Sequence, residues 1–174
     1  TTDAFTDQAV FTHPGRGVDG YTEGKMNPAG GYMDMQWMSW TQLYPFIRSA
    51  NIAIQKLTAN EGGLEAGLVK RLLGEAHFMR GYLFSQLMRQ YGGVVLLTEP
   101  LTLESEASNP RSSFEATVDQ IVSDLDQAIS LLADAPQSKA RAHALTAHAL
   151  KSRVLTHAAS DLHDPVKNAG VSTI

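Results

Sequence analysis

The chain of 174 residues is 43% hydrophobic, which is enough for one domain with a buried core. Fourteen basic and eighteen acidic residues give a net charge of -4 with no basic block to neutralise phosphates, so we expect no nucleic-acid partner. The absence of cysteine excludes disulfides, thiolate metal sites and a cysteine nucleophile.

Residues 1–36 are rich in glycine, threonine, proline and aspartate, which predicts a long loop with at most one short helix near residues 4–12. Gly15, Gly17 and Gly20 match the letters of the dinucleotide-binding pattern G-x-G-x-x-G. That site requires a strand before the glycines and a helix after them, and the sequence predicts neither. We therefore interpret this stretch as loop and expect no nucleotide cofactor.

Aromatic side chains lie in or beside this loop without the periodicity that would bury them. They are Tyr21, Tyr32 and Trp37, and Asp34 is close to them in sequence. An aromatic face stacks on the apolar face of a sugar ring, while a carboxylate accepts hydrogen bonds from sugar hydroxyls. We therefore predict Tyr21, Tyr32, Asp34 and Trp37 as ligand-binding residues. The alternative is a small hydrophobic cluster beneath the loop.

The first long helix is predicted from about Gln36 to Ala59, because apolar residues recur there at helical spacing. Pro45 lies inside it, which predicts a kink or a helix that begins again at the proline. Asn51 falls on the apolar face, where a buried amide needs hydrogen-bond partners. We expect Glu75 or Arg80 of the next helix to supply them.

The second helix, from Leu64 to Gly93, is the one around which we expect the chain to fold. Its apolar residues recur in steps of three and four, at Val69, Leu72, Leu73, Ala76, Met79, Leu83, Phe84, Leu87, Met88 and Tyr91. Glu75 and Arg80 flank this stripe and need partners, because a half-buried charge is tolerated only when it is paired. We expect this helix to pack antiparallel to the first, with its charged residues neutralised across that contact.

A third helix follows an extended apolar run, residues 94–97, and a polar crossing. Ser112 and Glu115 match a capping box, in which the hydroxyl and the carboxylate satisfy free amides at a helix start. The apolar pattern continues to Leu132. We expect the outer, solvated face of this helix to carry its acids Asp119, Asp124 and Asp126.

A fourth helix is predicted from about Ala140 to Ser160. The predicted fold is therefore all-α, with antiparallel helix hairpins stacked in a tetratricopeptide-like scaffold and a long loop-rich amino-terminal region. We assign residues 1–36 to that loop-rich segment, 37–160 to the helical domain of two hairpins and 161–174 to the start of a truncated variable region. Two hairpins rarely suffice for a helical stack, so we expect a fragment of a longer protein.

Motifs for catalysis or metal binding are weak. There is no G-x-S-x-G nucleophile motif. The late histidines lack the i, i+4 spacing of a helical zinc site, with separations of five, nine and six residues between His143, His148, His157 and His163. Asp161, His163 and Asp164 form a tighter group, which we interpret as a polar helix end. We predict no catalytic residue, no metal and no cofactor.

Separated motifs occur in a characteristic order along the four predicted helices. The first two helices carry Trp40, Tyr44, Ile47, Ala50, Asn51, Glu75, Ala76, Phe78, Arg80, Gly81, Tyr82, Leu83, Tyr91, Gly92 and Gly93. The last two carry Arg111, Ser112, Ser113, Ile121, Asp124, Leu125, Ala128, Leu132, Arg141, Ala147, Ala149, Leu150, Lys151 and Arg153. Over about residues 36–160 this order resembles the SusD/RagB-like family of nutrient-binding outer-membrane lipoproteins.

The resemblance implies a tetratricopeptide-like scaffold that carries a variable binding region. It also implies a protein that is not an enzyme: one that captures a glycan or other nutrient oligomer at the cell surface and delivers it to a SusC-like TonB-dependent transporter in the outer membrane. Family members are tethered by a lipid on an amino-terminal cysteine, which this chain lacks. The family uses residues that match Asn51, Glu75, Arg80 and Arg141 for its scaffold.

Two other functions are open alternatives. A helical protein-interaction scaffold would dock a partner protein and bind no small molecule of its own. An all-helical glycoside hydrolase would need two facing carboxylates a few ångströms apart. Acid pairs such as Asp124 with Asp126, or Glu104 with Glu106, point to different faces or lie in a loop, so we interpret them as solvated charges.

Overall fold

The structure, a computed structural model, describes residues 7–8, 12, 39–101, 109–135, 140–164 and 166–167. The chain divides into two compact units, Thr1–Gln42 and Leu43–Ile174. The first unit is described at residues 7–8 and 12 and from residue 39 onwards, where a helix begins. Most of the described structure therefore belongs to the second unit.

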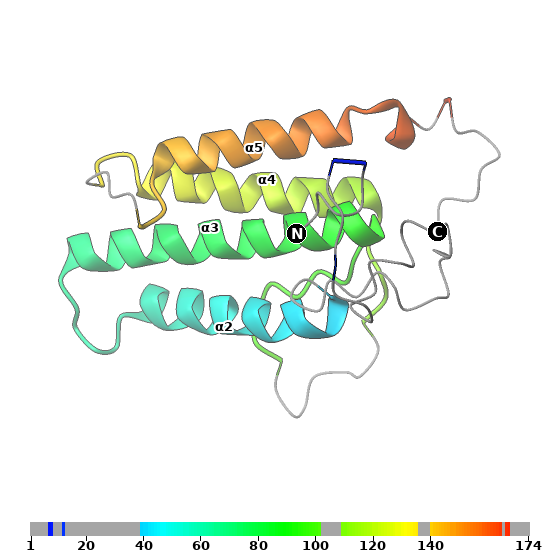
Figure 1. The fold of residues 1–174 in the computed structure, drawn as a ribbon. Helices are drawn as coiled ribbons and strands as arrows, with labels where there is room; N and C mark the ends of the chain where they lie inside the picture. Colours follow the sequence, from blue (N-terminus) through cyan, green and yellow to red (C-terminus); the bar gives the residue numbers. More distant parts are fainter. Residues whose placement is uncertain are drawn as a thin grey trace. The chain divides into compact units, whose positions relative to one another are not determined.

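The regular structure of the described residues is helical. It consists of α2 (Trp40–Ala59), α3 (Ala66–Tyr91), α4 (Phe114–Leu131), α5 (Ala144–Ala158) and the 3₁₀ helix η3 (Asp161–His163). No strand occurs within these described ranges. Successive α-helices alternate in direction, α3 lies between α2 and α4, and α5 packs against α4 (Figure 1). The predicted all-α fold of adjacent antiparallel hairpins is confirmed.

Helix α3 forms the centre of the core. Every residue from 83 to 88 is buried, including Phe84 and Leu87, which are fully enclosed. Buried apolar residues of α2 and α4, such as Ile47 and Ile121, belong to the same core. Met79 was predicted on the same stripe but is 46% exposed. At 3.6 residues per turn Met79 points about 140° away from Phe84, which places it outside the core-facing arc.

Helices α3 and α4 pack together with the most extensive contact among the described helices. Glycines on α3 permit this approach. A β-carbon added at Gly74 would lie 2.7 Å from Cγ of Leu132, and one added at Gly81 would lie 3.3 Å from Cβ of Asp124. Since these glycines are two helical turns apart, they form one smooth strip on the α3 surface that faces α4.

The end of α3 is joined to the start of α4. Gly92 has a φ of 71°, which confirms that glycine closes the helix. Arg111 donates to the carbonyls of Tyr91 and Gly93, where a cation is favourable at a helix carboxyl end. Gly93 lies directly against the backbone of Ser112, because an added β-carbon would be 2.2 Å from that carbonyl oxygen.

The predicted capping box at Ser112 is wrong by one residue. The hydroxyl of Ser113 accepts from the amide of Ala116 at 3.0 Å and is the N-cap of α4. The amide of Ser112 instead donates to the carbonyl of Val94 at 2.8 Å. Ser112 is therefore held in the junction with the end of α3, and Ser113 caps the helix.

The helix that contains Pro45 was predicted either to kink or to begin again there. Pro45 lies inside α2, which does not begin again at that residue.

We expect Gly93→Ala to lower the free energy of unfolding by about 2–3 kcal/mol, because the new methyl group would overlap a backbone carbonyl that cannot move without displacing α4. Urea unfolding followed by circular dichroism measures the change. The matched control is Gly62→Ala, since nothing lies within 4 Å of a β-carbon there. It should change stability by no more than about 0.5 kcal/mol. Equal effects of the two substitutions would contradict the close junction.

Candidate functional site

The predicted ligand-binding residues Tyr21, Tyr32, Asp34 and Trp37 lie outside the described residues, as do the early glycine motif and the short helix predicted near residues 4–12. Their role therefore stays a prediction. The described residues show the helical part of the chain. Its most specific feature is a buried polar cluster that joins three helices to the segment after α3.

Segment 94–101 is held against α2 by side chains that bind its backbone carbonyls. The hydroxyl of Tyr44 donates to the carbonyl of Val95 at 2.8 Å. The side-chain amide of Asn51 donates to the carbonyls of Leu97 at 2.7 Å and Glu99 at 3.3 Å. Burial raises the pKa of Tyr44 to about 12, so its hydroxyl keeps the proton that it donates. Within the described ranges the segment pairs with no strand, so these side chains provide hydrogen bonds to carbonyls that a sheet would otherwise satisfy.

Arg80 is the centre of the cluster. Its Nη1 donates to Oδ1 of Asn51 and to the carbonyl of Thr98, both at 2.9 Å. Its Nε and Nη2 donate to the two carboxylate oxygens of Asp124 at 2.9 Å and 2.6 Å. One guanidinium thus links α2, α3, α4 and segment 94–101. The expectation that Glu75 or Arg80 supplies a partner for the buried Asn51 amide is confirmed for Arg80.

Asp124 was predicted on the solvated face of its helix, and that prediction is wrong: Asp124 is only 1% exposed. Nδ1 of His77 lies 2.9 Å from its Oδ1, and the Gln120 amide donates to its Oδ2 at 3.3 Å. Burial alone would raise the pKa of Asp124, but the hydrogen bonds from His77 and Arg80 outweigh it and lower the pKa below the ordinary value. The sequence does contain a signal for this burial. Asp124 is next to Leu125 and seven residues after Thr117, both of which are buried, so it falls on the same face of α4 as Thr117.

Glu75 pairs with residues other than those of the first hairpin. The Arg141 guanidinium, in the segment before α5, donates to both carboxylate oxygens, and Arg71 donates from one turn earlier in α3 at 3.3 Å. The hydrogen bond from Arg141 lowers the pKa of Glu75. The expected neutralisation of Glu75 and Arg80 across the contact with α2 is therefore wrong. Their charges are balanced by the second hairpin, because α3 packs most extensively against α4.

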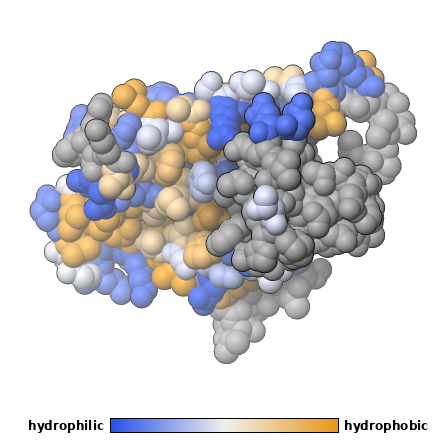
Figure 2. Space-filling model, in the orientation of Figure 1, coloured by the Kyte–Doolittle hydropathy of each residue, from blue (hydrophilic) through white to orange (hydrophobic). Residues whose placement is uncertain are grey.

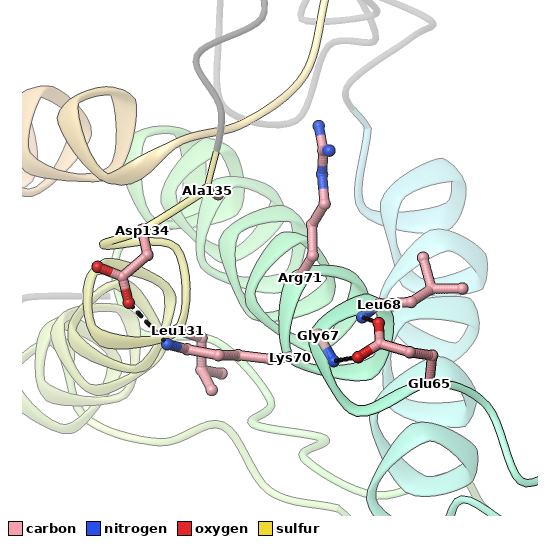
Figure 3. A pocket seen from close by; sticks show the side chains of 8 residues that line it. All are labelled: Glu65, Gly67, Leu68, Lys70, Arg71, Leu131, Asp134 and Ala135. Atoms are coloured by element: carbon pink, nitrogen blue, oxygen red, sulfur yellow. Dashed lines mark hydrogen bonds and ion pairs between the residues drawn. The ribbon is translucent and has the colours of Figure 1, made fainter.

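A shallow hollow of about 480 Å³ lies where α3 begins and α4 ends (Figure 3). Lys70 extends across the hollow and forms an exposed ion pair with Asp134 at 3.1 Å. The Glu65 carboxylate accepts hydrogen bonds from the backbone amides of Gly67 and Leu68. These contacts cap α3 and close the bundle end. Because the charged groups that line the hollow are exposed and already paired, it offers little to a ligand.

Several of the described acids have partners outside the buried cluster. Asp126 pairs with Lys151 and Asp161 with Lys167. Within the described ranges no group of three or more histidines and acids gathers around a metal position, so Asp161, His163 and Asp164 do not form one. Asp124 is the one fully buried carboxylate among those ranges, and it lies in an ion pair. None of the described helices combines the length and apolar character of a membrane span.

We expect Asp124→Ala to lower the free energy of unfolding by about 3–5 kcal/mol at neutral pH, because the substitution leaves a buried guanidinium without its counter-ion. The control is Asp126→Ala, whose carboxylate is half exposed, and it should cost less than about 1 kcal/mol. Urea titrations of the three proteins measure both values. Equal effects would contradict a dominant buried pair.

The contribution of Asp124 should also depend on pH. Because its pKa is lowered in the folded chain, the stabilisation is complete above the ordinary aspartate pKa of about 4 and is lost as the pH falls through the lowered value. The difference in stability between the parent chain and Asp124→Ala should therefore shrink below about pH 4. A difference that stays constant down to pH 2 would show that the carboxylate charge is not the cause.

Comparison with known proteins places this arrangement in a family. Residues 21–155, well over half of the chain, match a SusD-like family model described as starch-binding and associating with the outer membrane. SusD-like protein P38 of Formosa agariphila is 32% identical over 94 residues, covering 53% of this chain and 18% of that protein.

Solved structures agree. A SusD-like protein of Bacteroides fragilis matches with a TM-score of 0.63 and 35% identity, over 68% of this chain and 23% of that one. A laminarin-binding SusD-like protein matches with a TM-score of 0.71 and 25% identity, over 89% of this chain and 33% of that one. The chain thus spans a third or less of the length of these relatives. On the extent of the family match and the shared helical fold, the chain belongs to the SusD-like family.

Proposed function

We propose that the protein to which this chain belongs binds an oligosaccharide at the cell surface, without converting it, and delivers it to a SusC-like TonB-dependent transporter. A lipid anchor outside this chain would hold it at the outer membrane. The observation that carries the proposal is the family match over residues 21–155. The described helices supply the scaffold, and the ligand is bound by loops that the scaffold supports.

The ligand class follows from two lines of support. The family is described as starch-binding, and one structural relative is described as laminarin-binding. The sequence also has Tyr21 and Tyr32 in a loop without helical periodicity, and Trp37 beside that loop near Asp34. Flat aromatic faces with a nearby carboxylate suit a sugar chain, which offers alternating C–H faces and hydroxyls.

The absence of catalysis is supported by the way in which the described acids are used. A glycoside hydrolase needs one carboxylate with a raised pKa and a second at a set distance across the substrate. The shifts resolved for Glu75 and Asp124 are both downward, since each accepts hydrogen bonds from arginine. These two carboxylates stay ionised at neutral pH and stabilise the scaffold, so neither suits a proton donor.

Calorimetric titration of the full-length protein with laminarin and starch oligosaccharides tests the ligand class. We expect heat with at least one of them, and we expect Trp37→Ala or Tyr32→Ala to weaken that binding tenfold or more, about 1.4 kcal/mol. The matched control is Phe46→Ala, which removes an aromatic ring that is 59% exposed on α2, outside the predicted site. It should leave the affinity unchanged. No heat with any oligosaccharide would exclude carbohydrate as the ligand class.

A protein-interaction scaffold is the second candidate, and the surface of the α2–α3 hairpin favours it. Figure 2 shows apolar surface over this hairpin, whose exposed apolar side chains include Phe46, Leu64, Leu68 and Met79. Under this alternative a pull-down recovers a partner protein, no oligosaccharide binds, and Trp37→Ala and Tyr32→Ala change nothing. Recovery of a transporter together with oligosaccharide binding would support the first proposal instead.

A further inference from the structure

The carboxyl end of α5 brings two imidazole rings together. Nε2 of His157, in the last turn of α5, lies 3.3 Å from Nε2 of His163, the last residue of η3. The ring centres are 5.0 Å apart, and the ring planes are inclined at 59°. Two ring nitrogens therefore face each other across the turn that joins α5 to η3.

A direct hydrogen bond accounts poorly for this geometry. The N···O separation in an N–H hydrogen bond is about 2.7–3.2 Å, and such bonds are strongest when nearly linear. A linear bond between these nitrogens would hold the ring centres roughly 5.6 Å apart. The observed 5.0 Å shows that the rings are bent away from the line joining the nitrogens. A long, bent N–H···N contact is weak.

A shared metal ion accounts for the geometry better. Zinc binds imidazole nitrogen at about 2.0–2.1 Å with tetrahedral angles, which places two ligating nitrogens about 3.3 Å apart and their ring centres about 5.2 Å apart. The observed values are 3.3 Å and 5.0 Å. Square-planar coordination would bring the nitrogens to about 2.9 Å. The geometry therefore favours a tetrahedral ion.

The ring of His163 is held in position by another helix. It stacks on Phe114, at the start of α4, with ring centres 4.0 Å apart and planes inclined at 13°. Burial, and then the charge of His157, lowers the pKa of His163. Its ring is therefore mostly neutral at neutral pH, and a neutral imidazole nitrogen has the lone pair that a metal requires.

Acids near the two histidines have other partners. Asp161 forms an ion pair with Lys167 at 2.5 Å. The Asp164 carboxylate accepts hydrogen bonds from the backbone amides of Val166 at 2.8 Å and Lys167 at 3.3 Å. Among the described residues the ligand set is thus two imidazoles, and water would fill the remaining positions of a bound ion. Such a site prefers a transition-metal ion to magnesium or calcium, which take oxygen ligands.

We propose that His157 and His163 form a two-histidine site for a tetrahedral divalent transition-metal ion, with zinc as the reference ion. Binding there joins the carboxyl end of α5 to η3. Because only two protein ligands are present in the described residues, the bound ion is exchangeable and the site is weaker than a four-ligand structural zinc site.

Calorimetric titration of the untagged 174-residue chain with zinc chloride tests the proposal. We expect binding of one zinc ion that is weakened about 100-fold or more by His157→Ala and equally by His163→Ala, because losing either ring removes the chelate. Zinc should raise the thermal unfolding temperature of the parent chain and of neither variant. Affinity should fall as the pH is lowered from 7 to 5, since protons compete for both rings.

His148→Ala is the matched control, because His148 is an exposed histidine on the same helix. It should bind zinc as the parent chain does, and magnesium or calcium should give no comparable heat. Circular dichroism checks the fold of each variant, and His163→Gln, which keeps a polar side chain, should show the same loss. The proposal is overturned if the parent chain binds no zinc, if neither His157→Ala nor His163→Ala weakens binding, or if His148→Ala weakens it equally.

Discussion

The bidentate ion pair between Arg80 and Asp124 is the contact on which the arrangement of the helices depends. A buried guanidinium or carboxylate alone costs several kcal/mol, so each group requires the other to be in place. The third guanidinium nitrogen of Arg80, Nη1, donates hydrogen bonds to Asn51 and to the carbonyl of Thr98. Four elements must therefore assemble together for any of these polar groups to be satisfied. This constraint favours a single packing of the two hairpins over alternatives that would bury only apolar surface.

Side chains of the same cluster hold segment 94–101 in place without a sheet. Its carbonyls accept hydrogen bonds from Tyr44, Asn51 and Arg80. The backbone N–H of its first residue, Val94, donates a hydrogen bond to the hydroxyl of Thr117 in α4 at 3.2 Å. The segment is thereby fixed along the hairpin although it has no regular structure. Side-chain contacts of this kind can hold a connecting segment in place without regular structure.

The end of the bundle where α3 begins differs from the end where α5 stops. The hollow where α3 begins is lined by exposed, paired charges that contribute little energy. At the carboxyl end of α5, by contrast, His157 and His163 present two ring nitrogens toward one another. Residue 161 is also where the sequence predicts the start of the variable region. A metal ion bound by these rings would therefore set the direction in which the chain leaves the scaffold.

The sequence by itself determined which stretches are helical, because periodic apolar residues and glycines encode local structure directly. It also identified the family, through separated motifs in order. It did not reveal the burial of Asp124, the shift of the cap from Ser112 to Ser113, or the facing nitrogens of His157 and His163. The burial of Asp124 depends on how α4 is rotated against α3, because a rotation by one residue turns a solvated position into a buried one. The cap and the histidine contact depend on how the chain enters α4 and leaves α5, where Ser112 bonds to Val94 and His163 stacks on Phe114. Contacts between segments far apart in the chain decide these details, and the local sequence pattern does not encode them.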